Sequence, residues 1–193
     1  MISNGHYQRM KKRRKHIRLR GYDYSSDGAY FITICTNNRE HFFGEIKYIV
    51  GPCHGMALPV PTSHEMIQSE IGKIAEQFWY EIPDHNKNIQ LDAFVVMPNH
   101  IHGILIIRTP VGSCHGMTLH RHSLFAKPIP GSISVIINQF KSAVKRWCNN
   151  NDQYHFMWQN RFHDHIIRNE KSYEIIRNYI LSNPENWHKD MFH

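Results

Sequence analysis

The segment of residues 92–107 constrains the fold most, because it contains two runs of apolar and β-branched residues, DAFVVM and HIHGILII. Pro98 and Asn99 separate the two runs. Proline interrupts the hydrogen-bond ladder of a strand, and asparagine favours turns. The segment therefore predicts an antiparallel β-hairpin with strands at residues 92–97 and 100–107.

Two further strands are expected nearer the N-terminus. Residues 29–36 (AYFITICT) are aromatic and β-branched and follow the turn-like sequence YSSDG. Residues 42–50 form a second run, and Asn37 and Asn38 lie where a turn would join the two. We expect these two strands to pair as a hairpin.

Three helices are predicted from helical spacing and capping residues. Thr62 and Glu65 can form a capping box, and the apolar residues that follow recur at helical spacing until Pro83. Residues 132–149 form an amphipathic helix whose polar side is basic. Asn169 can cap a last helix that runs to about residue 182, before Pro184. The order of elements predicts an α+β fold, with helices on one face of an antiparallel sheet.

Composition favours a packed protein with a phosphate-rich partner. The chain has 193 residues, 41% of them hydrophobic, and a net charge of +7. This charge points to nucleic acid or an anionic membrane. The apolar runs are much shorter than the roughly 20 residues of a membrane span, and no apolar segment follows the basic N-terminus, so we expect a cytoplasmic protein without a membrane partner. The four cysteines lack CxxC spacing and are expected to be reduced thiols.

The N-terminus is strongly basic. Residues 10–20 contain seven Lys or Arg in eleven positions, a block whose self-repulsion disfavours packing. We interpret residues 1–20 as a DNA-facing arm, the alternative being a solvated tail without a specific role. The expected DNA contacts in this arm are Lys11, Lys12, Arg13 and Arg14. Residues 21–193 are expected to form a single domain.

Two near-identical segments, VGPCHGM at residues 50–56 and VGSCHGM at residues 111–117, fall in expected loops near 50–61 and 110–130. Cys and His are acceptable zinc ligands, so one interpretation is a zinc site. The other is a pair of tolerated surface-loop insertions derived from a repetitive DNA element. The residues of the zinc hypothesis are Cys53, His54, Cys114 and His115.

Two histidines in the second strand of the Pro-Asn hairpin are candidate metal ligands. Side chains alternate along a strand, so His100 and His102 project from the same face. In a chain with sixteen histidines this spacing is weak evidence alone. A third histidine at position 104 would have indicated a histidine-triad nucleotide hydrolase, but this residue is Ile104.

The last predicted helix offers two groups that could meet the histidine pair. Tyr179 and Asn183 are four residues apart and share a helix face. A phenol and an amide oxygen could then converge on one divalent metal. The alternative for Tyr179 is an ordinary half-buried helix tyrosine.

Three ordered segments, MPNHIHGILI, WQNRFHDHIIRN and YILSNP, resemble those of the REP-associated tyrosine transposases in the IS200-like, single-tyrosine HUH superfamily. The resemblance covers roughly residues 21–187 and implies a ferredoxin-like HUH fold. It implies that His100, His102 and Asn183 bind Mg²⁺ or Mn²⁺, and that Tyr179 attacks DNA to give a 5′-phosphotyrosine and a free 3′-hydroxyl. The CHGM segments depart from the family pattern, as does Glu185-Asn186-Trp187, where many relatives have a Gly-Leu ending.

The same resemblance implies a single-stranded hairpin DNA partner and strand transfer without ATP. Basic residues would hold the DNA backbone, although those of the helix at 132–149 could equally form an ordinary solvated face. His165 is a candidate contact to the scissile phosphate, whereas Trp158 and Phe162 are expected in the core. A homodimer and a monomer both remain open, and the alternative function is a non-catalytic hairpin-DNA-binding protein. The further DNA-binding candidates are Lys141, Lys145, Arg146 and Arg161.

Overall fold

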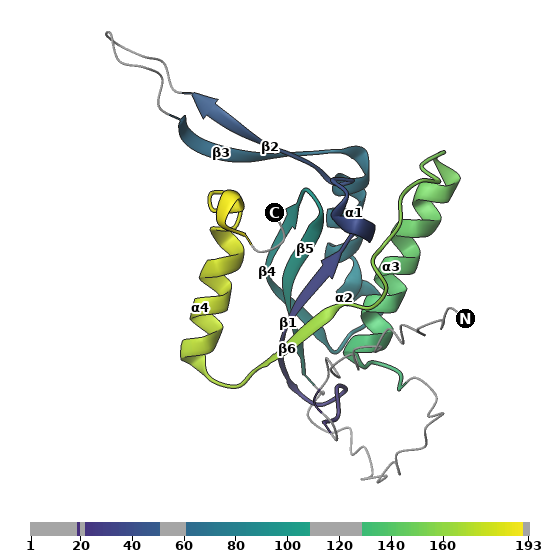
Figure 1. Cartoon of the computed structure of the whole chain (residues 1–193). Helices are drawn as coiled ribbons and strands as arrows, with labels where there is room; N and C mark the ends of the chain where they lie inside the picture. The colour runs from purple at the N-terminus through teal and green to yellow at the C-terminus, as the bar shows by residue number, and fades with distance from the viewer. Residues whose placement is uncertain (1–18, 20–21, 51–60, 109–128, 191–193) are drawn as a thin grey trace, which may run out of the picture.

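The computed structural model describes residues 19, 22–50, 61–108 and 129–190. Its centre is a four-stranded antiparallel sheet in the order β4-β5-β1-β6 (Figure 1). The strands are β1 (Gly28–Cys35), β4 (Ile89–Met97), β5 (His100–Ile107) and β6 (His163–Ile167). The predicted hairpin is confirmed, because β4 and β5 pair across Pro98 and Asn99 with Met97 opposite His100.

The expected pairing of the first two strands is wrong. β1 pairs with β5 and β6, both far away in the sequence. The run at 42–50 instead contains β2 (Gly44–Val50), which pairs with β3 (Pro61–Gln68) in a separate two-stranded sheet that projects from the body (Figure 1). β1 is almost entirely apolar, so a central position between two strands buries it better than a two-stranded hairpin would.

The predicted start of the first helix is also wrong. Residues 61–68 form β3, and Ile67, expected on a buried helix face, is 40% exposed. Helix α1 (Glu70–Tyr80) begins after Ser69, whose side chain accepts a hydrogen bond from the Gly72 N–H. Pairing with β2 therefore prevails over the Thr62 and Glu65 capping box. A short helix α2 (Ile82–His85) follows, with Pro83 in its first turn, where proline is tolerated.

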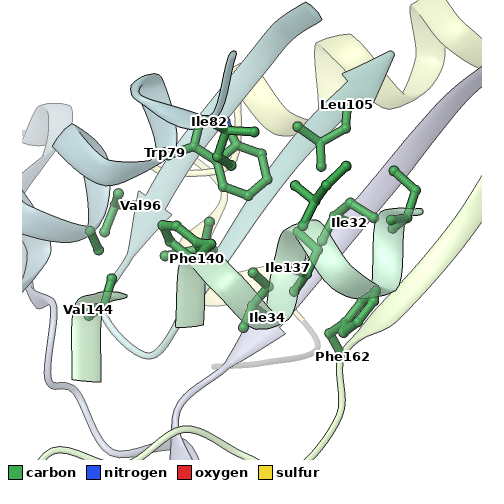
Figure 2. Close-up of a cluster of buried hydrophobic side chains, with 14 of the residues drawn as sticks. Ile32, Ile34, Trp79, Ile82, Val96, Leu105, Ile137, Phe140, Val144 and Phe162 are labelled. Carbon is green, nitrogen blue, oxygen red and sulfur yellow. The ribbon is translucent and has the colours of Figure 1, made fainter. Parts of the chain in front are cut away.

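One face of the sheet is covered by α1, α2 and α3 (Ile133–Asn150), as Figure 1 shows. Figure 2 shows the resulting core, in which Ile32 and Leu105 of the sheet meet Trp79 and Phe140 of the helices. The helix predicted at 132–149 is confirmed, with its apolar side inward. Trp158 and Phe162 lie in or against this core, as expected.

Helix α4 (Glu170–Leu181) lies on the other face (Figure 1). Its Ile180 is fully buried in a second apolar cluster with Ala93, Ile104 and Ile167. The α+β class and the antiparallel sheet are confirmed, but the expectation of helices on one face holds only for α1 to α3. Sheet residues that point away from α1 and α3 are also apolar, and they need a helix of their own to cover them.

Asn169 caps α4 as predicted, since its side chain accepts a hydrogen bond from the Ser172 N–H. Two short 3-10 helices, η1 (Asn37–Arg39) and η2 (Trp187–Lys189), complete the described elements. Among the described residues, no helix is both long enough and apolar enough to cross a membrane. The predicted basic arm with Lys11, Lys12, Arg13 and Arg14, and the four Cys and His residues of the zinc hypothesis, lie outside the described residues.

Candidate functional site

The histidine pair lies on the α4 face of β5, at the start of this inner strand. His100 is fully buried and His102 is 1% exposed. Alternation along β5 sends Ile101 and Gly103 to the opposite face, where the ring of Trp79 packs directly against Gly103. The two imidazole rings lie side by side, with centroids 4.4 Å apart.

Neighbouring polar groups orient both rings. His100 Nδ1 lies 2.8 Å from Asn99 Oδ1, and His102 Nδ1 lies 2.9 Å from the hydroxyl oxygen of Thr33. A ring that donates from Nδ1 carries its lone pair on Nε2, the arrangement found in metal-binding histidines. On the α4 side, Nε2 of His100 lies 3.9 Å from a carboxylate oxygen of Asp190, and Nε2 of His102 lies 3.2 Å from the hydroxyl oxygen of Tyr179.

Both imidazoles favour the neutral form that a metal ligand requires. Burial and the nearby Arg39 guanidinium lower the pKa of His100 to about 3. Burial, reinforced by His100, lowers the pKa of His102 well below its ordinary value. The pair is therefore uncharged at neutral pH.

Tyr179 extends from the last turn of α4 toward this pair. Its hydroxyl oxygen lies 3.2 Å from Nε2 of His102. Its ring packs edge-on against Phe31, and the side chain is 38% exposed. The tyrosine thus reaches both the histidine pair and the surface.

Asn183 lies one turn after Tyr179 and is 2% exposed. Its amide nitrogen donates a 2.7 Å hydrogen bond to Asp190. Its amide oxygen is buried and has no hydrogen-bond partner within the described part of the chain. Asp190, to which this amide donates, lies 3.9 Å from Nε2 of His100. An orphaned oxygen in this setting suits a cation, which would supply the missing interaction.

Asp190 is a site residue that the sequence reading missed. His100 and His102 each offer a ring nitrogen, and Asp190 offers a carboxylate oxygen; these three potential ligand atoms all lie within 4.8 Å of one another. The Asp190 carboxylate also accepts a 3.1 Å hydrogen bond from Tyr179. Trp187 of η2 stacks against His100, which places Asp190 over the pair. No motif spacing links Asp190 to the histidines, so the sequence offered no signal for it.

The surroundings keep the Tyr179 hydroxyl protonated. Burial, together with the charge of Asp190 and the hydrogen bond to it, raises the pKa of Tyr179 to about 12. A phenol held in this form is a weak nucleophile unless positive charge is brought close to it. A cation close to this oxygen would favour its deprotonated, nucleophilic form.

Polar contacts hold α4 on the sheet two turns before Tyr179. The Tyr173 hydroxyl donates a hydrogen bond to Asp92 of β4. Arg177 Nε lies 3.4 Å from the same carboxylate. These contacts, with buried Ile180, fix the helix that presents Tyr179.

The predicted basic face of α3 lies on the opposite side of the sheet from this site. Lys141 donates hydrogen bonds to the carbonyl oxygens of Gln159 and Arg161, and Lys145 donates to those of Tyr154 and Phe156. Both ammonium groups therefore hold the segment that leads into β6. Arg146 and Arg161 are exposed.

His165 lies on the site face of the sheet but away from the histidine pair. It is exposed and stands opposite Phe31 in the pairing of β6 with β1. The structure thus brings together His100, His102, Tyr179 and Asn183 and adds Asp190, whereas His165 lies on the same face two strands away, with β1 between.

Comparison with known proteins supports a common origin with transposases. Residues 108–183 match the family model described as "Transposase IS200 like". An uncharacterised protein of Haemophilus influenzae is 36% identical over 182 residues, which are 93% of this chain and 93% of that protein.

The fold is also that of a solved transposase. The structure of a REP-associated tyrosine transposase bound to a REP hairpin superposes with a TM-score of 0.53 and 19% identity, over 86% of this chain and 72% of that one. The antiparallel sheet and its flanking helices are therefore shared. The match of residues 108–183 to the family model assigns the chain to the IS200-like transposase family.

Proposed function

We propose that the protein cuts and rejoins single-stranded DNA through a covalent bond to Tyr179, with a divalent metal held by His100, His102 and Asn183. One observation carries the proposal: the Tyr179 hydroxyl lies 3.2 Å from His102 Nε2 within one chain. A partly exposed tyrosine whose hydroxyl lies next to two buried, neutral imidazoles is the arrangement that a metal-assisted tyrosine nucleophile requires.

The proposed ligands are the Nε2 atoms of the two histidines and the amide oxygen of Asn183, with Asp190 as a further candidate. Imidazole and oxygen donors suit Mn²⁺, and Mg²⁺ is also compatible. When bound, a divalent cation would neutralise charge on the scissile phosphate and open positions would remain for that phosphate.

The residues would then act as follows. The phenolic oxygen of Tyr179 forms a bond to phosphorus, and the bond from phosphorus to the 3′ oxygen breaks. The phenol proton is lost and the departing 3′ oxygen gains one, so the products are a 5′-phosphotyrosine and a free 3′-hydroxyl. Attack by a 3′-hydroxyl reverses the step and joins strands without ATP, because the phosphotyrosine conserves the ester bond.

Hairpin DNA is the proposed partner. The REP-associated transposase with the same fold was solved on a REP hairpin, and the net charge of +7 suits a polyanion. The rival hypothesis is a protein that binds such hairpins without cutting them.

The test is a denaturing-gel assay with a hairpin oligonucleotide that carries single-stranded tails of randomised sequence and a 3′ label. Wild-type protein with Mn²⁺ should retain label covalently, and EDTA should prevent this. Tyr179→Phe should abolish the adduct. Tyr80→Phe is the matched control, since Tyr80 is exposed on α1, across the sheet. No adduct with wild type, or an adduct that persists in Tyr179→Phe, would refute cleavage and favour the binding hypothesis.

A further inference from the structure

We infer that the DNA strand attached at Tyr179 continues across the open half of the same sheet face, over Phe31, His165 and His163. The inference rests on the proposed function and adds to it a path for the single strand. It is carried by the strand register, by the exposure of the two histidines and by the ring contacts of Phe31 with His102 and Tyr179.

Helix α4 covers only part of its face of the sheet. It packs chiefly on β4 and β5, on one side of the sheet. Tyr179 projects from its last turn toward Phe31 of β1. Tyr179, which is 38% exposed, thus contacts the part of β1 that pairs with β6.

The register puts two further histidines on this face. Thr33 of β1 stands opposite His102 on one side and opposite His163 on the other. Residues directly opposite each other in antiparallel strands share a face. His163 therefore lies on the face of His102, and His165, two residues along β6, lies there too.

Both β6 histidines are exposed, whereas the two isoleucines that follow them pack in the protein interior. Ile166 points to the other face and packs against the large core. Ile167 is buried under α4. His163 and His165 thus have no core role that accounts for their position.

Aromatic rings link the candidate cleavage site to this surface. The Phe31 ring centroid lies 5.2 Å from that of His102 and 6.2 Å from that of Tyr179. Phe31 is half-buried, and its cross-strand partner on the open side is His165. Tyr179, Phe31 and His165 thus follow one another across the sheet by ring contact and by register, and they offer rings on which unpaired bases can stack.

The occupant that fits is single-stranded DNA. Stacking on side chains needs unpaired bases, and a strand joined to Tyr179 must leave the site over an adjacent surface. Exposed Arg161 and Arg168 flank β6 at its two ends and suit the phosphates of such a strand. Imidazole N–H groups can also donate hydrogen bonds to phosphate oxygens.

The test measures binding separately from cleavage. Fluorescence anisotropy would follow a labelled single-stranded oligonucleotide of mixed sequence binding to the full-length Tyr179→Phe protein. We expect His163→Ala with His165→Ala to raise the Kd about 10-fold or more, as the loss of one or two stacked bases would. His165→Phe, which keeps a ring, should recover most of the affinity. His85→Ala is the control, because His85 is exposed on α2 across the sheet.

An unchanged Kd in the double alanine variant, with unchanged thermal unfolding, would overturn the path. The two proposals can fail separately. If wild-type protein forms the covalent adduct while the β6 histidines leave affinity unaltered, only the path is wrong. If the β6 histidines govern affinity but no adduct forms, the path stands and cleavage is wrong.

Discussion

The hydroxyl oxygen of Tyr179 on α4 lies 3.2 Å from Nε2 of His102 on β5, although the two residues are 77 positions apart. The contact forms within one chain, so the candidate site is complete without a helix from a second copy. A homodimer is still compatible with this geometry, but it is not needed to bring the tyrosine to the histidines.

Asn183→Asp should make the protein depend more strongly on metal. The new carboxylate would lie where the Asn183 amide contacts Asp190, 2.7 Å away, so without metal the two charges repel and Tm should fall. With Mn²⁺, an anionic carboxylate oxygen in place of the neutral amide oxygen strengthens binding, so the rise in Tm on adding Mn²⁺ should exceed that of wild type. Asn178→Asp, on the exposed side of α4, is the control. A smaller Mn²⁺ response than wild type would contradict Asn183 as a ligand.

Asp92→Ala should loosen the helix that carries Tyr179. The substitution leaves the Tyr173 hydroxyl and Arg177 without their shared acceptor. We expect the free energy of unfolding in urea to fall by about 1–3 kcal/mol and covalent adduct formation to decrease. Glu174→Ala, which changes an exposed acid on the same helix, should do neither. Full stability in Asp92→Ala would show that apolar packing alone holds α4.

Gly103→Ala should destabilise the core behind the histidine pair. A Cβ atom at this position would lie 2.3 Å from Cζ2 of Trp79, so the ring or the strand must shift. Such overpacking costs about 1–3 kcal/mol. In a double-mutant cycle, Trp79→Phe should cost less in the Gly103→Ala background than in wild type, because it removes the clashing ring. Strictly additive losses in chemical denaturation would argue against this contact.

Lys145→Met should act mainly on stability. The ammonium group donates to the carbonyl oxygens of Tyr154 and Phe156, at 3.1 and 2.6 Å. Their loss should lower the free energy of unfolding by about 1–2 kcal/mol. The neighbouring Arg146 is exposed, so Arg146→Met should change stability by less than about 0.5 kcal/mol. If Lys145→Met weakened DNA binding at unchanged stability, Lys145 would instead be a DNA contact, as the sequence suggested.

Local periodicity accounts for what the sequence by itself determined. Alternation along β5 put His100 and His102 on one face, and helical spacing put Asn183 one turn from Tyr179. The β4 and β5 hairpin and the capped helix α4 were predictable for the same reason, since each depends on residues close in sequence.

Only the tertiary structure decided which elements meet. β1 pairs with β5 and β6 rather than with its neighbour in sequence, because a central position buries both of its apolar faces. α4 crosses to the face opposite α3, which joins Tyr179 to the histidines and separates Lys141 and Lys145 from them. Asp190 becomes part of the candidate site because Trp187, three residues earlier, packs on His100. These pairings and packing contacts depend on which distant segments bury the most apolar surface together, and this cannot be read from a short stretch of sequence.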